Sequence, residues 1–167
     1  TGGSNLIKNS QFLLSDETWE FIENSEDPLA YHTPIGEGYN SSLIGETVAV
    51  ANIVLRNSKA ITTVNNITNL KLSTSHTLNY YISQDSNTTT IIKLISKRTS
   101  EKIYEEIITT DNSHTIDMKN YSFKFVANDT DYILQIDTTT ILDGYVKIYD
   151  LMLNSGDKKS WEPATSE

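Results

Sequence analysis

The chain has 167 residues and no cysteine, and its 22 acidic against 13 basic side chains give a formal net charge of −9 at pH 7. A chain of this length suits a single domain that folds without covalent or metal cross-links. The negative charge opposes binding to nucleic-acid phosphates and to anionic membrane surfaces. The absence of cysteine excludes disulfides, thiolate metal sites and cysteine nucleophiles. Apolar runs of about six residues are far too short to cross a membrane, so no membrane insertion is expected.

Thr, Ile, Val and Tyr recur in runs that are separated by Asn, Asp, Ser and Gly. Runs of β-branched and aromatic residues between turn-forming residues predict β-strands. No segment keeps apolar residues at helical spacing for three turns. In chain order, the expected strands cover residues 5–12, 18–24, 46–56, 59–65, 70–83, 89–98, 102–109, 115–125, 131–138 and 143–153.

Several of these runs alternate between apolar and polar residues. Leu78, Tyr80 and Ile82 share one face of their strand, while Tyr81 points to the other, and residues 132–137 alternate in the same way. One apolar and one polar face is typical of an antiparallel sheet with one side in water. The sequence therefore predicts an all-β fold, a two-sheet antiparallel β-sandwich of the jelly-roll, galactose-binding-like kind.

One long irregular stretch, residues 25–45, holds two of the three prolines and three of the seven glycines. A loop of this length in a compact domain is usually functional. This stretch contains Tyr31, His32 and Tyr39. Because strand propensity does not explain aromatic rings in a loop, we take these three residues as candidate ligand contacts. The alternative is that they pack the loop onto the sandwich.

The two ends of the chain carry short motifs. Residues 5–12 read NLIKNSQF and are followed by Trp19, and residues 146–156 read VKIYDLMLNSG and are followed by Trp161-Glu162-Pro163. Together these motifs resemble the ends of carbohydrate-binding-module-like domains, related to families 4, 9 and 22 of these modules, in tail and baseplate proteins of phages that infect Gram-positive bacteria. The resemblance implies a domain over residues 5–156, with 157–167 as an exit segment. Residues 1–4, which read TGGS, are expected to be a linker or tag remnant.

The same resemblance raises the question of a structural calcium ion. Many secreted modules of this kind place an acidic ligand just after the first Phe, but here Leu13 follows Phe12, and only Asp150 is retained. Calcium takes six to eight oxygen ligands. Asp150 is thus a weak metal candidate, its alternative role is to tie the last strand to the first by hydrogen bonds, and no other cofactor is expected.

Catalytic signatures are missing from the sequence. His32, His76 and His114 lie in different segments, and no metalloprotease, nucleophile-elbow or phosphate-binding motif occurs. Glu105 and Glu106 are adjacent, but neighbours on a strand point to opposite faces and so cannot act as a carboxylate pair. We expect no enzyme activity, and we expect His76 to lie on the surface at the entry to a strand.

Sugars offer apolar C–H faces and a rim of hydroxyls, which proteins meet with aromatic rings and planar polar groups. Tyr81 is the best single candidate, because the resemblance places its face on an exposed concave sheet. Tyr104, Gln84 and Arg56 are weaker candidates near the same sheet, whereas Trp19 is expected in the core and Trp161 in packing or linker docking.

The sequence thus predicts a non-catalytic module on a phage tail or baseplate that binds a host cell-wall polysaccharide or another glycan, beside other domains of a virion protein. Three alternatives stay open. They are a structural spacer or assembly domain of a virion protein, an accessory module of a secreted or cell-surface glycan-degrading enzyme, and, least favoured, a stand-alone glycosidase.

Overall fold

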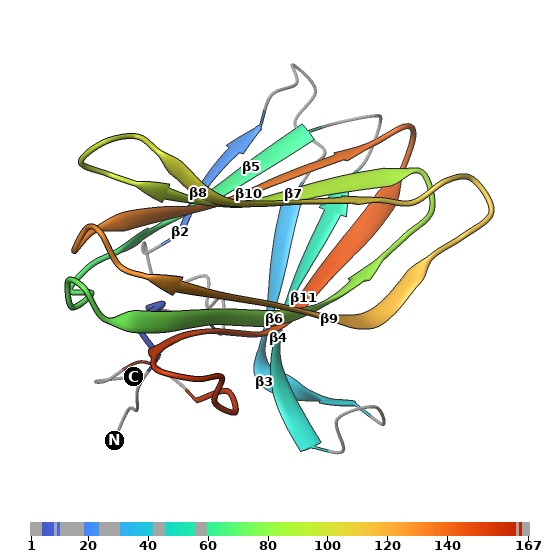
Figure 1. Cartoon of the computed structure of the whole chain (residues 1–167). Helices are drawn as coiled ribbons and strands as arrows, with labels where there is room; N and C mark the ends of the chain where they lie inside the picture. Colours follow the sequence, from blue (N-terminus) through green and yellow to red (C-terminus); the bar gives the residue numbers. More distant parts are fainter. Residues whose placement is uncertain are drawn as a thin grey trace.

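The computed structural model describes residues 5–8, 10, 19–23, 31–41, 46–55, 60–162 and 164, with the backbone alone for 21–23, 31–41 and 46–55. Two five-stranded antiparallel sheets lie face to face as two layers (Figure 1). The part of the chain described contains no helix long and apolar enough to cross a membrane. The predicted all-β, two-sheet antiparallel sandwich is confirmed.

The first sheet has the strand order β2-β5-β10-β7-β8. Its strands are β2 (Trp19–Glu23), β5 (Ala60–Ile67), β10 (Tyr132–Thr140), β7 (Thr88–Ser96) and β8 (Lys102–Thr109). The second sheet has the order β3-β4-β11-β6-β9. Its strands are β3 (Tyr31–Ser41), β4 (Glu46–Leu55), β11 (Gly144–Ser155), β6 (Ser75–Gln84) and β9 (Ile116–Val126).

The hydrophobic core fills the space between the sheets. On β6, Leu78, Tyr80 and Ile82 are 0% exposed, as the alternation predicts, and they face Leu94 of β7 and Leu134 of β10 in the same cluster. Burying a side chain of this size stabilises the fold by about 1.5–3 kcal/mol. Trp19 belongs to this cluster too, at 6% exposed, which confirms its predicted place.

The irregular stretch predicted over residues 25–45 is wrong over Tyr31–Ser41, which forms the edge strand β3 and pairs with β4. The register shifts between Ile35 and Tyr39, so a bulge accommodates the two glycines between them. Pro34 lies opposite Ala51 on this edge strand, where proline is tolerated because the other side of the strand needs no N–H donor.

Of the described residues in the expected strand over 5–12, Asn5 alone is in a β-bridge, and residues 6–8 and 10 form turns or irregular structure. Asn5 forms a single parallel bridge with Ala164, and the Leu6 N–H donates to the Leu153 carbonyl at 2.7 Å. Residues 9, 11 and 12 lie outside the described part. The two end motifs nevertheless meet, because the Asn5 side-chain amide donates to the carbonyls of Leu151 and Glu162, each at 3.0 Å.

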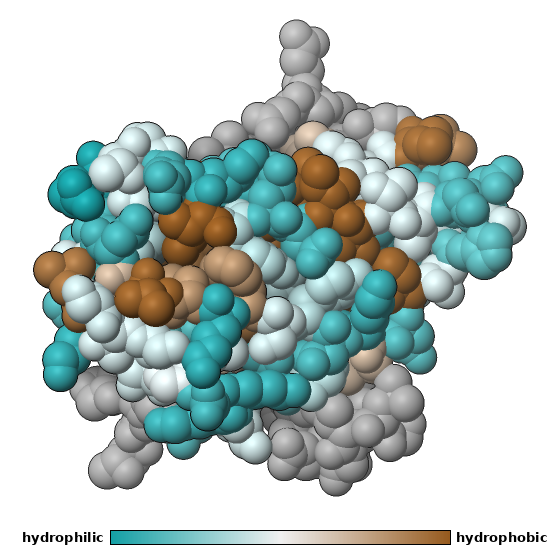
Figure 2. Space-filling view, viewed as in Figure 1, coloured by the Kyte–Doolittle hydropathy of each residue, from teal (hydrophilic) through white to brown (hydrophobic). Residues whose placement is uncertain are grey.

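Exposed apolar side chains do not form one large face on the side seen in Figure 2, where they appear as separate brown groups among polar residues. Ile141 and Leu142, at 64% and 72% exposed, lie together in the turn between β10 and β11. Small separate groups of this kind are ordinary on a soluble domain.

Candidate functional site

The outer face of the second sheet, the face turned away from the first sheet, carries the side chains that alternate with the core. Asn79, Tyr81 and Ser83 of β6 point to this face because Leu78, Tyr80 and Ile82 point inward. Tyr149 of β11 lies directly opposite Tyr81 in the register, and Lys147 lies opposite Ser83. The predicted orientation of Tyr81 is confirmed, and its ring is partly exposed.

The segment after β11 folds back over this outer face, below β6 in Figure 1. From here on, the exit segment means residues 157–162, the continuous part of the predicted segment 157–167 that the structure describes. Asp157 pairs with Lys124 of β9, and the Asn154 side-chain amide donates to the Asp157 carbonyl at 2.7 Å. At the far end of the segment, the Trp161 indole N–H donates to the Ser10 hydroxyl at 3.0 Å. The exit segment is therefore fastened to the sandwich at both ends.

Between the sheet and the exit segment lies a pocket of about 190 Å³. Its lining residues are Asn79, Tyr81, Asp150, Lys158, Lys159, Ser160 and Trp161. Sites for drug-sized ligands usually measure about 300–1,000 Å³, so this one suits a single ring of a longer ligand.

The polar groups around Tyr81 are held in place. The Asn120 side-chain amide donates to Asn79 Oδ1 and to the Tyr80 carbonyl, each at 2.9 Å. The Lys158 ammonium donates to Asn120 Oδ1 at 3.3 Å and lies 5.7 Å from the centroid of the Tyr81 ring. A flat ring with amide, hydroxyl and ammonium donors beside it can pack on an apolar ligand face and bond to its polar rim.

Asp150 also lines this pocket, at 6% exposed and with a φ of 51°, where the register of β11 and β6 shifts between Tyr149 and Met152. Asp is one of the few residues that adopt this left-handed conformation readily. In the described part of the chain no three acidic, histidine or cysteine side chains lie together as metal ligands. The role of Asp150 as a metal ligand therefore stays a prediction, and Leu13 lies outside the described residues.

Gln84 was predicted as a ligand contact, and the structure corrects this. Gln84 is 0% exposed, because it follows Tyr80 and Ile82 on the inward face of β6. Its amide donates to the carbonyls of Thr88 and Ile108 at 2.9 and 3.1 Å, and its Oε1 accepts from the Thr90 hydroxyl at 2.6 Å. Gln84 ties the two sheets together and leaves no polar atom for a surface ligand.

Tyr104 was expected near the same sheet as Tyr81, and this is wrong. It lies on β8, the edge of the first sheet, and its ring stacks on Phe123 at a centroid distance of 4.6 Å. Its hydroxyl pairs with the Tyr80 hydroxyl at 2.9 Å. Burial raises the pKa of Tyr104. Tyr104 thus closes the sandwich between the sheets instead of facing the pocket.

Of the other predicted contacts, the structure describes the backbone of three and leaves the fourth outside the described part. Tyr31, His32 and Tyr39 have their backbone in β3, and the strands β4 and β11 separate β3 from β6. That spacing is about 14 Å between strand axes. Arg56 lies outside the described residues. The role of these four residues stays a prediction.

The structure adds residues that the sequence did not suggest. Lys158, Lys159 and Ser160 line the pocket, and so does Trp161, which was expected only to pack or to dock a linker. A Trp close behind two lysines was the one available signal. It could not be interpreted, because the position of the exit segment depends on distant contacts with Ser10 and Lys124.

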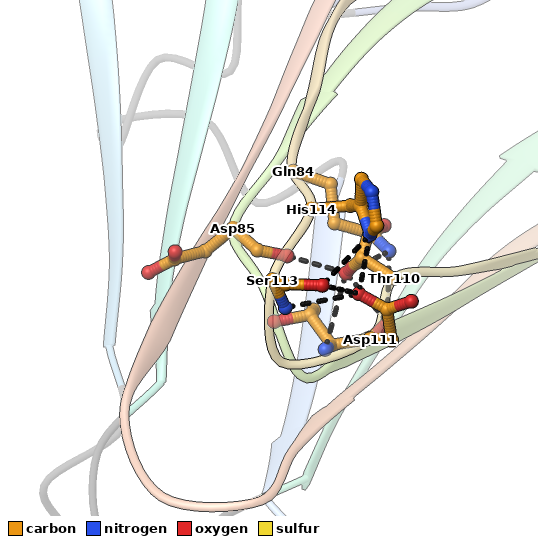
Figure 3. A network of polar contacts seen from close by, with 7 residues as sticks. Gln84, Asp85, Thr110, Asp111, Ser113 and His114 are labelled. Carbon is orange, nitrogen blue, oxygen red and sulfur yellow. Dashed lines mark hydrogen bonds and ion pairs between the residues drawn. The ribbon is translucent and has the colours of Figure 1, made fainter.

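A Ser-His-Asp group in the turn between β8 and β9 invites comparison with a catalytic triad (Figure 3). However, the Asp111 carboxylate and the Ser113 hydroxyl both contact Nδ1 of His114, at 2.7 and 3.0 Å. A triad needs the acid and the nucleophile on opposite ring nitrogens. Hydrogen bonds to the Asp111 carboxylate lower its pKa from 3.8 to about 2, and the bond from the Ser113 backbone N–H contributes more than the bond from the His114 side chain. The side chains of His114 and Asp111 are 74% and 63% exposed, so the group has the features of a solvated turn.

Thr110, the residue before Asp111, makes hydrogen bonds further inward. Its hydroxyl donates to the Asp85 carbonyl and accepts from Gln84 (Figure 3).

The expectation that His76 lies on the surface is wrong. His76 is 1% exposed, stacks on Phe125 at 5.7 Å and places Nδ1 2.8 Å from the Thr74 carbonyl. It shares the inward face of β6 with Leu78.

No protein-family model and no curated protein sequence matches this chain. Among solved structures, the enzymatically active domain of tailspike protein 4 of bacteriophage CBA120 is similar, with a TM-score of 0.65 and 11% identity, over 91% of this chain and 21% of that one. TmCBM61 in complex with β-1,4-galactotriose has a TM-score of 0.64 and 10% identity, over 92% of this chain and 100% of that one. An α-L-arabinofuranosidase, MgGH51, has a TM-score of 0.52 and 11% identity, over 27% of its length.

At such low identity these likenesses define the fold alone. The chain has the β-sandwich fold of carbohydrate-binding modules, and it matches TmCBM61 over that module's whole length. It spans about a fifth of the tailspike chain.

Proposed function

We propose that this chain is a non-catalytic carbohydrate-binding module and that the pocket beside Tyr81 holds one ring of its saccharide. The observation that carries the proposal is the partly exposed Tyr81 ring in a pocket whose rim is polar. Tyr81 was selected from the alternation of β6 and from the end motifs, and the pocket is an independent geometric feature. Aromatic rings with convergent polar groups suit sugar faces and hydroxyls.

We further propose that the parent is a phage tail or baseplate protein and that the saccharide belongs to the host cell wall. The two end motifs support this, and so does the fold likeness to a phage tailspike. A small pocket gives weak single contacts, of about millimolar to micromolar strength, and repeated copies on a virion would raise the overall strength by avidity.

The experiment is calorimetric titration of the purified chain with host cell-wall polysaccharides and defined oligosaccharides, β-1,4-galactotriose included. Tyr81→Ala is expected to weaken binding at least about tenfold, because stacking and hydrogen bonding at the ring are both lost. Tyr145→Ala is the matched control, since Tyr145 is a partly exposed ring on the outer face of β11 that does not line the pocket. Equal loss in both variants, or no binding of any saccharide, would argue against the proposal.

An accessory module of a glycan-degrading enzyme is the second candidate, and the fold likeness to an arabinofuranosidase favours it. The pocket would serve the same purpose in that setting. The two candidates differ in the protein that carries the domain, so the flanking sequence of the parent chain decides between them.

A further inference from the structure

We infer that the saccharide bound beside Tyr81 carries a carboxylate or phosphate group. This inference rests on the proposed function and adds the chemical class of the ligand. It starts from two ammonium groups, those of Lys158 and Lys159, in the lining of one pocket on a protein with a formal net charge of −9.

Both lysines are exposed, and within the described residues neither is in an ion pair, whereas Lys93 and Lys124 are paired with aspartates. An ammonium group has three N–H donors. Lys158 donates to a neutral amide oxygen, Asn120 Oδ1, at 3.3 Å, so donors remain for a ligand.

The local charge is positive. Among the described residues, the pocket lining holds two cations and one acidic side chain, Asp150, so these residues together carry a net charge of 2 − 1 = +1. Asp150 is only 6% exposed and thus lies deeper than the two lysines. The exit segment holds two further acids: Asp157 is paired with Lys124, and Glu162, which follows Trp161, is not among the residues that line the pocket. An anionic group that approaches the pocket therefore meets the ammonium groups first.

The position of Lys158 distinguishes between neutral and anionic sugars. Its ammonium lies over the Tyr81 ring, 5.7 Å from the centroid, so a sugar that packs on that face must move it. An exposed cation–π contact is worth about two- to fivefold in an equilibrium constant. A hydrogen bond from the same ammonium to a carboxylate or phosphate is worth about ten- to a hundredfold. An anionic saccharide replaces the lost contact with a stronger one, and a neutral saccharide does not.

The test is calorimetry with three trisaccharide probes: a neutral galactose trimer, a galacturonic acid trimer, and a galactose trimer phosphorylated on O6. We expect at least one anionic probe to bind about tenfold or more tightly than the neutral one, and the tighter of the two anionic probes distinguishes carboxylate from phosphate. The double variant K158Q/K159Q is expected to remove this difference, and added salt is expected to weaken anionic binding. Lys97→Gln, the same charge change in the exposed turn between β7 and β8, should have no effect.

The outcomes are separable. If the neutral and anionic probes bind equally, at a site that Tyr81→Ala abolishes, the inference is wrong and the proposed function stands. If anionic binding survives in K158Q/K159Q at full strength, the lysines are not the contacts and the inference is also wrong. If no saccharide of any kind binds, both proposals are overturned. Thermal unfolding of each variant shows that the fold is kept, which is expected because both lysines are exposed.

Discussion

The side chain of Asn5 bonds to the backbone of Leu153, 148 positions away, through its Oδ1, which accepts from the Leu153 N–H at 3.1 Å. The same Oδ1 accepts from the Ile7 N–H at 3.0 Å, while the Asn5 amide nitrogen donates to Leu151, Glu162 and Ser10. Asn5 is 3% exposed, so water cannot take its place as the hydrogen-bond partner of these backbone and side-chain groups. One asparagine thus joins the N-terminal segment, β11 and the exit segment.

Asn5→Ala is therefore expected to lower the free energy of unfolding by about 2–4 kcal/mol, because buried donors and acceptors on both chain ends lose their partner. Denaturant unfolding measures this change. Asn112→Ala, at an exposed turn position, is the matched control and should change stability by less than about 0.5 kcal/mol. Similar stabilities for the two variants would contradict the structural role given to Asn5.

The hydroxyl pair of Tyr80 and Tyr104 predicts an asymmetry. Tyr80 is 0% exposed and Tyr104 is half-buried, and burial raises the pKa of Tyr80 far above its usual range, so its hydroxyl stays neutral. Tyr104→Phe leaves a buried hydroxyl without a partner and should cost about 1–3 kcal/mol. Tyr80→Phe leaves a hydroxyl that water can reach and should cost less.

A double-mutant cycle checks this pair. Removing both hydroxyls takes away the interaction without leaving a buried orphan, so Y80F/Y104F should be more stable than Tyr104→Phe alone. Additive losses, or a greater loss in Tyr80→Phe than in Tyr104→Phe, would show that the 2.9 Å contact does not control the stability of this region.

The alternation along a strand predicted which way side chains point better than the polarity of the residues did. The period of two along β6 correctly placed Leu78, Tyr80 and Ile82 inward and Tyr81 outward. The same period places His76 and Gln84 inward as well, yet their polar side chains suggested the surface. Both side chains are buried because other parts of the chain supply hydrogen-bond partners inside the sandwich. For Gln84 one such partner is Thr90, which lies on a different strand.

The missing parts of the prediction all depend on contacts between distant segments. Proline and glycine in residues 31–41 favour a loop locally, but pairing with β4 and a bulge make them an edge strand. The exit segment looks like a linker in the sequence, and its position over Tyr81 follows from Lys124 and Ser10, which lie far away along the chain. Local propensity and period contain no information about such pairings.

Asp129 gives a prediction for acid stability. The Ser96 hydroxyl donates to its carboxylate at 2.7 Å and the Arg98 N–H at 2.8 Å, and these bonds, led by that of Ser96, lower the pKa of Asp129 from 3.8 to about 2. A lowered folded-state pKa means that the ionised carboxylate stabilises the fold above about pH 4 and that this contribution is lost as the pH falls towards 2.

Asp129→Asn should therefore lower the melting temperature at neutral pH, and the gap from the parent protein should narrow between about pH 4 and pH 2. Thermal unfolding followed by circular dichroism over this range measures it. Ser96→Ala removes the leading donor to the carboxylate. It should also lower the melting temperature at neutral pH, by a smaller amount than Asp129→Asn does, and this difference from the parent should likewise narrow towards pH 2. A gap that is constant with pH would mean that the Asp129 carboxylate does not titrate in this window.

Trp161 links the exit segment to the pocket, and its substitution should separate local from global stability. The indole donates to Ser10 at 3.0 Å and lines the pocket. The segment is also held by the exposed Asp157–Lys124 ion pair, worth about 0–1 kcal/mol, and by hydrogen bonds to the side chains of Asn5, Asn154 and Asn120. Trp161→Ala is expected to speed amide hydrogen exchange over residues 157–162, with little change in strands β6 and β11.

The saccharide affinity of Trp161→Ala should fall about three- to tenfold, because one wall of the pocket becomes mobile. Trp161→Phe keeps a ring but loses the donor, so it should fall between the parent and the alanine variant. If exchange over 157–162 stays as slow as in the parent while β6 and β11 become faster, the indole supports the sandwich as a whole and not the pocket wall.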